Sequence, residues 1–298
     1  MLSMRHRAFL AVAKSLNFSE AAKVLFMSQP AISKHIKALE DLYKQALFER
    51  KGNSIKLTPA GTLLFSHVKE AYKIEQTLEY DLSTLTNKMN AKGELKLGAS
   101  TTVALYIIPK ILSGFHQQYA DIKISLLNRN TDTIVKALLE DDISIGIVEG
   151  KNKISTITYQ PFVTDEVVAV CSAKSQIAKN RFITLKEFVK LPIALREQGS
   201  GTLAAVKDWM DKKGIKLSGL NVGIRLAGTE ALKNFLLEDH CLGFLPKGSI
   251  SRELQDGTLI PVNIDHFDIK RNFYFIQRRG SENNEINKSF VRFCKKSL

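Results

Sequence analysis

Hydrophobic residues recur at helical spacing over the first 43 residues and divide them into three amphipathic segments. The segments span residues 2–16, 19–26 and 28–40, and Ser19 and Ser28 are the expected N-caps of the second and third helices. The third segment has one apolar stripe, formed by Ile32, Ile36, Leu39 and Tyr43. This stripe predicts that one face of the helix packs into a core.

The opposite face of the third segment is polar and basic, and its side chains can reach hydrogen-bond acceptors or phosphates. They are Gln29, Ser33, Lys34 and Lys37. Pro30 lies in the first turn, where its missing N–H costs little, and only Met27 and Ser28 separate this helix from the second. Such a pair is typical of a helix-turn-helix, whose second helix enters the DNA major groove. An ordinary helical hairpin with a solvated face is the alternative.

Two short stretches that follow, residues 48–50 and 55–57, predict a β-hairpin. Its tip consists of Lys51, Gly52, Asn53 and Ser54, and the glycine and asparagine tolerate turn conformations. Residues 1–60 hold ten lysines and arginines against four acidic residues, a net charge of +6. A positive face supplies sequence-independent DNA affinity, so we expect the hairpin to be a wing that contacts the DNA backbone or minor groove.

A long helix is predicted from Thr58, a cap followed by a proline at the first helical position. Alternating spacings of four and three define one stripe along it, apolar except for the acid: Leu64, Val68, Ala71, Glu75, Leu78, Leu82, Leu85 and Met89. The stripe resembles the seam of a coiled coil over roughly 50 Å and predicts a dimerisation helix. Packing against its own domain is the alternative. Residues 88–93 are polar and end at a glycine, which suits a hinge.

Strands alternate with helices from residue 94 onward, which predicts an α/β fold with parallel strands. The expected strands are residues 94–100, 122–128, 143–150, 165–172, 191–197, 221–226, 241–246 and 271–279. The expected helices are residues 101–119, 131–142, 201–213, 229–239 and 285–296. The last strand and helix return to the first block, as in the two-lobed architecture of periplasmic binding proteins. The full α/β multidomain arrangement is a winged helix-turn-helix at 1–58, a linker helix and hinge at 59–92 and a two-lobed α/β domain at 93–298, with lobe one at 93–161 and 267–298 and lobe two at 162–266.

Polar residues gather at the expected strand ends, where helix N-termini face the cleft between two such lobes. Hydroxyls and free backbone N–H groups are offered by Ser100, Thr101, Thr102, Gly199, Ser200, Gly201, Thr202 and Thr229, together with Thr131 as the cap of its helix. Arg196 ends the strand before Gly199, and such donors favour a small anion. Glu149, also at a strand end, either pairs with Arg196 or another cation or lies outside the site.

The composition excludes several classes of protein. The chain has 298 residues and a net charge of +13, without an apolar run long enough to cross a bilayer or a signal-peptide pattern at its start, so a cytoplasmic protein without a membrane partner is expected. Neither the three cysteines nor the six histidines have metal-ligand spacing, and no cofactor is predicted. Cys171 and Cys241 could form a redox pair, but the surrounding apolar stretches favour buried, reduced thiols.

Residues 9–61 closely resemble the N-terminal domain of LysR-type transcriptional regulators, through the segment FLAVAKSLNFSEAAKVLFMSQPAISKHIKALEDLYKQALFERKGNSIKLTPAG. The resemblance continues more loosely to the C-terminus. It implies a homodimer, or a dimer of dimers, that binds double-stranded promoter DNA and a small effector. It places Gln29, Pro30, Ser33 and Lys34 on DNA and makes Arg50 the wing arginine, with the predicted tip residues Lys51 and Asn53 beside it. The tip lacks the second arginine of many members, which weakens the expectation of minor-groove contact.

The segments LYIIPK, SIGIVEG and LREQGSGT are most similar to regulators of sulfur assimilation. This branch resemblance implies sulfite, sulfate or a sulfur metabolite as effector, with Ser100, Thr102, Arg196, Ser200 and Thr202 as ligands. A carboxylate effector fits the same donors. An enzyme built on the α/β lobes is the competing function, but the chain contains no dinucleotide-binding glycine motif, phosphate-binding loop or nucleophile elbow. A binding module that retains the helix-turn-helix only as a scaffold is a third hypothesis.

Overall fold

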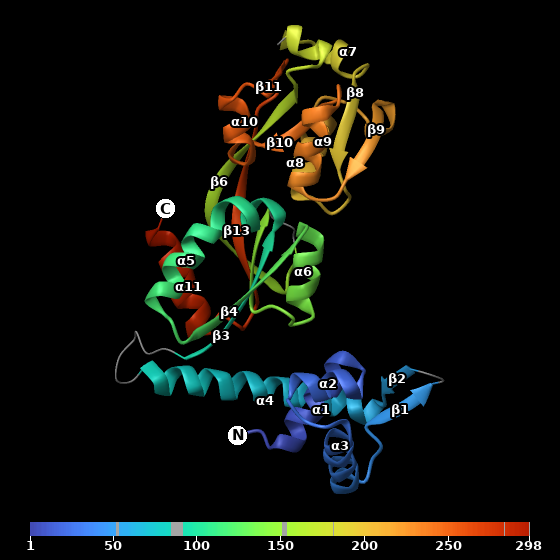
Figure 1. The fold of residues 1–298 in the computed structure, drawn as a ribbon, viewed down its shortest axis with the longest axis vertical. Helices are drawn as coiled ribbons and strands as arrows, with labels where there is room; N and C mark the ends of the chain where they lie inside the picture. Colours follow the sequence, from blue (N-terminus) through green and yellow to red (C-terminus); the bar gives the residue numbers. More distant parts are fainter. Residues whose placement is uncertain (52–53, 85–91, 151–153, 181, 283, 298) are drawn as a thin grey trace. The chain divides into compact units, whose positions relative to one another are not determined.

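The computed structural model describes residues 1–298 except 52–53, 85–91, 151–153, 181, 283 and 298 (Figure 1). The chain divides into two compact units, Met1–Gly93 and Glu94–Leu298. The first contains the predicted helix-turn-helix and long helix, and the second contains the α/β lobes.

Three helices and a hairpin form the N-terminal part of the first unit as predicted: α1 (Met4–Ser15), α2 (Phe18–Val24), α3 (Gln29–Tyr43), β1 (Phe48–Lys51) and β2 (Ser54–Leu57). The strands are antiparallel, with Phe48 opposite Leu57. Ile32, Ile36 and Leu39 of α3 lie in the core, but the predicted stripe ends there, because Tyr43 is exposed and its hydroxyl bonds to His6 Nε2 at 3.1 Å.

The predicted cap of α2 is wrong by two residues. Asn17 caps this helix, since its Oδ1 accepts hydrogen bonds from the backbone N–H groups of Ser19 (2.9 Å) and Glu20 (3.1 Å). Ser28 caps α3 as expected, and its Oγ accepts from Ala31 N at 3.4 Å. Asparagine and serine are about equally good N-caps, so the sequence alone did not reveal which of Asn17 and Ser19 caps the start of α2.

The long helix α4 (Pro59–Thr84) begins as predicted, with Thr58 Oγ1 accepting from Gly61 N at 3.0 Å. The proposed seam is wrong in its first half. Leu64 and Val68 pack into the core of the helix-turn-helix. Glu75 binds Arg7 at 2.8 Å, so this face belongs to the helix's own domain. The large apolar side chains left exposed on α4 are Leu63, Ile74, Leu78 and Leu82. The predicted seam residues Leu85 and Met89 and most of the predicted hinge lie outside the described residues.

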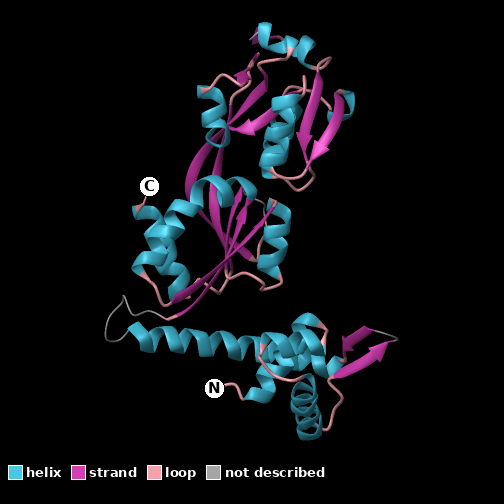
Figure 2. Ribbon diagram, viewed as in Figure 1, coloured by secondary structure: helices cyan, strands magenta, loops and turns pink. Residues whose placement is uncertain are grey.

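Lobe one contains the strands β3 (Gly93–Ser100), β4 (Ile122–Arg129) and β5 (Ile145–Glu149), and β3 and β5 are parallel. Helices α5 (Ile108–Gln118), α6 (Thr131–Leu139) and α11 (Glu285–Lys296) pack around them (Figure 2). The helix expected at 101–119 contains a π-helical turn, η2 (Val103–Ile107), before α5. π-helical turns are frequent at functional sites, and this one directly follows Thr102.

Lobe two contains the parallel strands β8 (Pro192–Arg196), β9 (Asn221–Leu226) and β10 (Leu242–Pro246). The helices α8 (Gly201–Lys212) and α9 (Thr229–Glu238) connect them, as the alternating pattern predicted. The shorter elements are α7 (Leu185–Phe188), α10 (Ser251–Gln255), β7 (Phe182–Ile183), β11 (Leu259–Pro261) and β12 (Asn263–Ile264). The apolar core of this lobe includes Phe188, Trp209 and Phe244.

Two long antiparallel strands, β6 (Ile157–Ser172) and β13 (Ile269–Arg278), connect the lobes (Figure 1). The sheet order is β4-β3-β5-β13-β6-β10-β8-β9, so hydrogen bonding is continuous from one lobe to the other. The prediction started the first of these strands eight residues too late, at Asp165, because residues 157–164 mix polar and apolar positions without regular alternation. Asp165 lies opposite Arg271 in the register, which places two charged side chains next to each other on the strands that connect the lobes.

Candidate DNA-binding surface and effector site

The N-terminal half of α3 exposes the predicted DNA-reading side chains on one face of the first unit. Gln29 Nε2 donates to Ser33 Oγ at 3.1 Å, which places both polar groups side by side. Ser28, Pro30, Lys34 and Lys37 are exposed. Lys37 forms an ion pair with Asp41 at 3.1 Å, and the hydrogen bond that the ammonium group donates to the Asp41 carboxylate raises the pKa of the lysine. Arg50 and Lys51 are in β1, while Asn53 lies outside the described residues.

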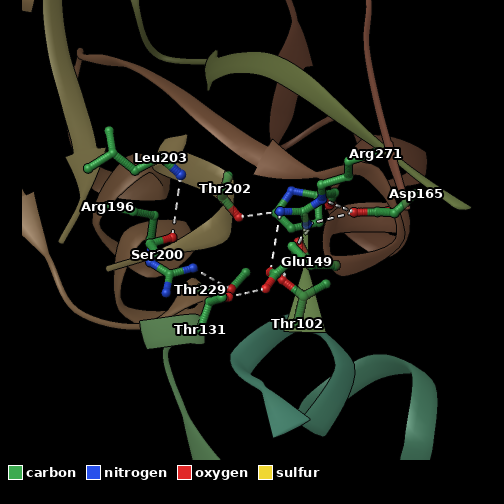
Figure 3. Close-up of polar contacts among 12 residues, drawn as sticks. Thr102, Thr131, Glu149, Asp165, Arg196, Ser200, Thr202, Leu203, Thr229 and Arg271 are labelled. Carbon is green, nitrogen blue, oxygen red and sulfur yellow. Dashed lines mark hydrogen bonds and ion pairs between the residues drawn. The ribbon is translucent and has the colours of Figure 1, made fainter. Parts of the chain in front are cut away.

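Arg271 is the central group of the interlobe site, and the sequence analysis missed it (Figure 3). Its Nε and Nη2 atoms donate to Asp165 Oδ2 at 2.9 and 2.6 Å. Nη1 donates to Thr202 Oγ1 at 2.9 Å and to Glu149 Oε1 at 3.3 Å, and Nη2 reaches Thr102 Oγ1 at 3.5 Å. These five contacts match the five N–H donors of a guanidinium group. One buried arginine therefore joins hydroxyls of both lobes.

Glu149 belongs to the same buried cluster and does not pair with Arg196. Its Oε2 accepts from Thr131 Oγ1 at 2.5 Å, and its Oε1 faces Arg271. Burial raises the pKa of Asp165, and the charge and hydrogen bonds of Arg271 only partly oppose this effect. The buried cluster thus contains two carboxylates and one guanidinium group, and Glu149 pairs with a cation other than Arg196, which is one of the alternatives that the sequence left open.

Arg196 forms a second buried group at the end of β8. Its Nε and Nη2 atoms donate to the two carboxylate oxygens of Glu197 at 2.8 and 3.0 Å, and Nη1 donates to Thr229 Oγ1 at 2.8 Å. Burial acts to raise the pKa of Glu197, but the hydrogen bonds and charge of Arg196 outweigh it and lower that pKa. The arginine predicted to meet an anion already has a carboxylate partner within its own lobe.

The strand-end loops of the two lobes touch each other. Asp132 N donates to Gly199 O, and Asn130 Nδ2 donates to Gln198 O, both at 3.3 Å. Asn130 caps α6, since its Oδ1 accepts from Thr133 N at 3.1 Å, so the predicted cap at Thr131 is wrong by one residue. This shift frees the Thr131 hydroxyl to donate to Glu149.

The start of α8 is built as predicted. Ser200 Oγ accepts from Leu203 N at 3.4 Å, and Gly199 has a φ of +81°, a conformation suited to glycine. Ser100 is buried, and its Oγ has no hydrogen-bond partner among the described residues. Thr101 is half-buried beside it. An unpaired buried hydroxyl is costly, which makes Ser100 a candidate ligand donor.

A cleft of about 930 Å³ opens between the lobes above this cluster. Thr131, Glu149, Ser200, Gly201 and Arg271 contribute to its lining, whereas Thr102, Arg196, Thr202 and Thr229 do not. The cleft continues along the exposed side of α8 and along β13. Of the predicted residues, Thr102, Thr131, Glu149 and Thr202 form one hydrogen-bonded group with Arg271, and Thr229 forms another with Arg196.

The three cysteines are free thiols. Burial raises the pKa of Cys171 to about 11 and is the main cause that raises those of Cys241 and Cys294 to about 12. Because the thiolate is the reactive form, these values disfavour oxidation by a thiolate mechanism. No cluster of metal-binding side chains occurs in the described parts of the chain. None of the described helices is long and apolar enough to cross a membrane.

A helix-turn-helix unit combined with a two-lobed α/β unit defines a transcriptional regulator with an effector-binding domain. Comparison with protein families agrees: residues 5–62 match the bacterial regulatory helix-turn-helix protein, lysR family, and residues 90–298 match the LysR substrate binding domain. The chain belongs to the LysR family of transcriptional regulators. Family membership excludes the enzyme hypothesis.

Individual relatives match the whole chain or its α/β unit. The regulator CysL of Bacillus subtilis (strain 168) is 24% identical over 97% of this chain and 95% of its own length. Full-length CbnR, solved in complex with its target DNA, has a TM-score of 0.67 at 19% identity, with complete coverage of both chains. The CcmR regulatory domain of Synechocystis PCC6803, solved with 2-PG, has a TM-score of 0.63 at 25% identity and covers 69% of this chain and 97% of its own.

Proposed function

We propose that this regulator binds promoter DNA as a homodimer, or a dimer of dimers, and that a small anionic metabolite bound between the lobes modulates this binding. The DNA contacts assigned to the chain are Ser28, Gln29, Pro30, Ser33, Lys34, Lys37, Arg50, Lys51 and Asn53. The exposed polar face of α3 supports this assignment, as does the crystallised complex of CbnR with its target DNA. In a helix-turn-helix, residues early in the second helix read base edges, and cations contact phosphates.

The exposed leucines of α4 support dimerisation. Leu78 and Leu82 lie four residues apart, are 48% and 57% exposed, and continue the line of Ile74. An apolar stripe of this length in water is typical of an interface. We therefore assign the second half of α4 to the partner protomer, while its first half packs on the helix-turn-helix of its own chain.

A pair of variants tests the dimer. Replacing Leu78 and Leu82 with Glu should raise the dimer dissociation constant at least about hundredfold, because two charges would be buried in the interface. Light scattering measures the mass, and Lys73→Glu, which places the same residue at an exposed position outside the stripe, should leave the dimer intact. A double variant that stays dimeric at nanomolar concentration would refute the assignment.

The effector class rests mainly on the donors that converge between the lobes. Arg271 draws hydroxyls of lobe one and lobe two together, Ser100 Oγ lacks a partner among the described residues, and Arg196 uses three of its five N–H donors in the described contacts. Hydroxyl and guanidinium donors select oxyanions. We propose sulfite, sulfate or a sulfur metabolite as effector, and a small carboxylate as the alternative. The complex of the CcmR regulatory domain with 2-PG provides the analogy for a small-molecule ligand.

Titration calorimetry on the full-length protein distinguishes these effectors. Sulfite, sulfate, phosphate and a panel of small carboxylates are the probes, and DNA binding is then measured with and without each anion that binds. The proposal expects one anion to bind and to change promoter affinity, because a ligand shifts an equilibrium only when it prefers one state. Preferential binding of an uncharged or cationic metabolite would contradict it.

A further inference from the structure

The carboxylate of Glu149 occupies the place in which the donors of the interlobe site would hold an anion. Glu149 ends β5, its side chain is 5% exposed, and its two oxygens face the Thr131 hydroxyl at 2.5 Å and Arg271 Nη1 at 3.3 Å (Figure 3). A hydroxyl donor and a guanidinium donor are the contacts that an oxyanion ligand needs.

The first residue of α8 approaches this carboxylate closely. A β-carbon at Gly201 would lie 2.7 Å from Glu149 Oε2 and 2.6 Å from its Cβ, so only glycine permits the contact. α8 has twelve residues, and a negative charge at the N-terminus of a helix is stabilised by the helix dipole. Lobe two therefore contributes its helix terminus to a carboxylate that belongs to lobe one.

Arg271 has no free N–H group for a second anion beside Glu149. The five N–H donors of Arg271 are all used, on Asp165, Glu149, Thr202 and Thr102. The cluster of Arg271 with two carboxylates carries one negative charge when all three groups are ionised. A bare anion brought to Arg271 would meet this charge at short range in a poorly solvated site, where repulsion is strong.

We propose that Glu149 is an internal competitor of the effector. Its carboxylate fills the anion position when no effector is present and leaves that position when an effector binds. This proposal rests on the proposed function, and it identifies Glu149 as a specificity-determining residue. An anion that replaces Glu149 must supply more or stronger contacts than one carboxylate, so weakly coordinating anions are rejected.

The structure provides a route for the exchange. Glu149 lines the cleft of about 930 Å³, so the space into which its side chain would turn lies directly beside it. When it leaves, the ligand replaces the Glu149 carboxylate as the group that contacts Thr131, Arg271 and the N-terminus of α8. The apparent affinity for the effector is then lower than its intrinsic affinity by the fraction of molecules in which Glu149 has left.

The test compares anion binding by full-length wild-type protein and Glu149→Gln. Glutamine keeps the volume and can accept from Thr131 but removes the charge, so the anion that binds wild-type protein should bind at least about tenfold more tightly. Glu238→Gln is the matched control, because this carboxylate is 78% exposed and pairs with Lys174 at the lobe surface. The control should bind the anion as wild-type protein does.

A second measurement follows the carboxylate itself in wild-type protein, and a variant serves only to assign its signal. Protein labelled with ¹³C at glutamate carboxyl groups is titrated with sulfate, sulfite and the carboxylate panel, and the Glu149 signal is identified by its absence in Glu149→Asp. The signal should shift as the anion saturates the site, because the carboxylate moves from Thr131 and Arg271 into water.

The possible outcomes separate the two proposals. Anion binding that is unchanged or weaker in Glu149→Gln, or a Glu149 signal that stays fixed at saturation, would overturn the competitor role and leave the anionic effector standing. If no anion binds wild-type protein or Glu149→Gln, both proposals are refuted. Tighter binding in Glu149→Gln together with a shifted signal supports both.

Discussion

The charged side chains on the outer face of α3 are exposed to solvent, whereas those in the cluster around Arg271 are buried and paired. Lys34 and Lys37 are exposed to solvent, and Lys37 forms a local ion pair of 3.1 Å with Asp41 on the same helix. Arg271 is 5% exposed and has a partner for every N–H group. A solvated cation costs little and remains available to phosphates, whereas a buried cation must be matched within the fold. Under the proposed functions, the exposed face of α3 can bind DNA phosphates as it stands, whereas the cluster around Arg271 must release the Glu149 carboxylate before an anion binds.

The largest expected effect follows from removing the buried cation. Arg271→Ala leaves Glu149 and Asp165 buried without their partner, and we expect a loss of about 3–5 kcal/mol in the free energy of unfolding of the α/β unit. Denaturant titration of the full-length protein, followed by tryptophan fluorescence of Trp209, measures it. Lys270→Ala is the control, since this neighbour on β13 is exposed, and it should cost less than about 0.5 kcal/mol.

Equal losses for these two variants would remove the contrast between exposed and buried charge. Such a result would mean that water or a rearranged side chain stabilises the buried carboxylates in place of Arg271. Arg271 could not then be the group that joins the lobes.

The second prediction concerns the two hydroxyls that Arg271 draws together. Thr102→Val and Thr202→Val should each weaken anion binding by about 1.5–3 kcal/mol, the usual contribution of a hydrogen bond to a charged group, and the double variant should nearly abolish it. Calorimetry with the anion that binds wild-type protein gives the affinities. Thr258→Val, an exposed threonine of lobe two outside this cluster, should bind normally. A double variant with wild-type affinity would place the anion elsewhere, at Arg196 or Ser100.

The helix-turn-helix was predictable from sequence because its contacts are local. The cap Ser28 and the buried Ile32, Ile36 and Leu39 belong to one helix, so their spacing alone fixes which face is buried and which is free. The lobes followed from alternating strands and helices for the same reason. The sequence also placed Thr102, Thr131 and Thr202 at strand ends where helices begin, and Glu149 at the end of β5.

Arg271 and Asp165 were missed because their pairing depends on the register of two strands 106 residues apart. A signal was nevertheless present: each is a charged residue at the start of a predicted buried strand, and a buried charge requires a partner. The half of α4 that packs on its own domain was missed for a similar reason. One helix can carry two apolar faces, and periodicity does not tell which face meets the partner.

The third prediction tests base reading on the exposed face. Gln29→Ala should weaken specific binding to the promoter by about 1–3 kcal/mol and leave binding to random DNA unchanged, because a base-edge contact carries sequence information. Fluorescence anisotropy with both DNAs measures the ratio. Gln45→Ala, just beyond the end of α3, is the matched control. A Gln29→Ala protein that separates operator from random DNA as well as wild-type protein does would refute the assignment.

The smallest expected effect is the loss of one phosphate contact at Lys34. Because the lysine is solvated, Lys34→Ala should not destabilise the fold, and it should weaken promoter and random DNA equally. The slope of log affinity against log salt should fall by about one, since one fewer counterion is released on binding. Lys216→Ala removes the same charge from an exposed site in lobe two and should leave the slope unchanged. If Lys34→Ala instead changed the preference between DNA sequences at constant slope, Lys34 would contact a base, and the exposed face of α3 would recognise DNA by more than Gln29 and Ser33.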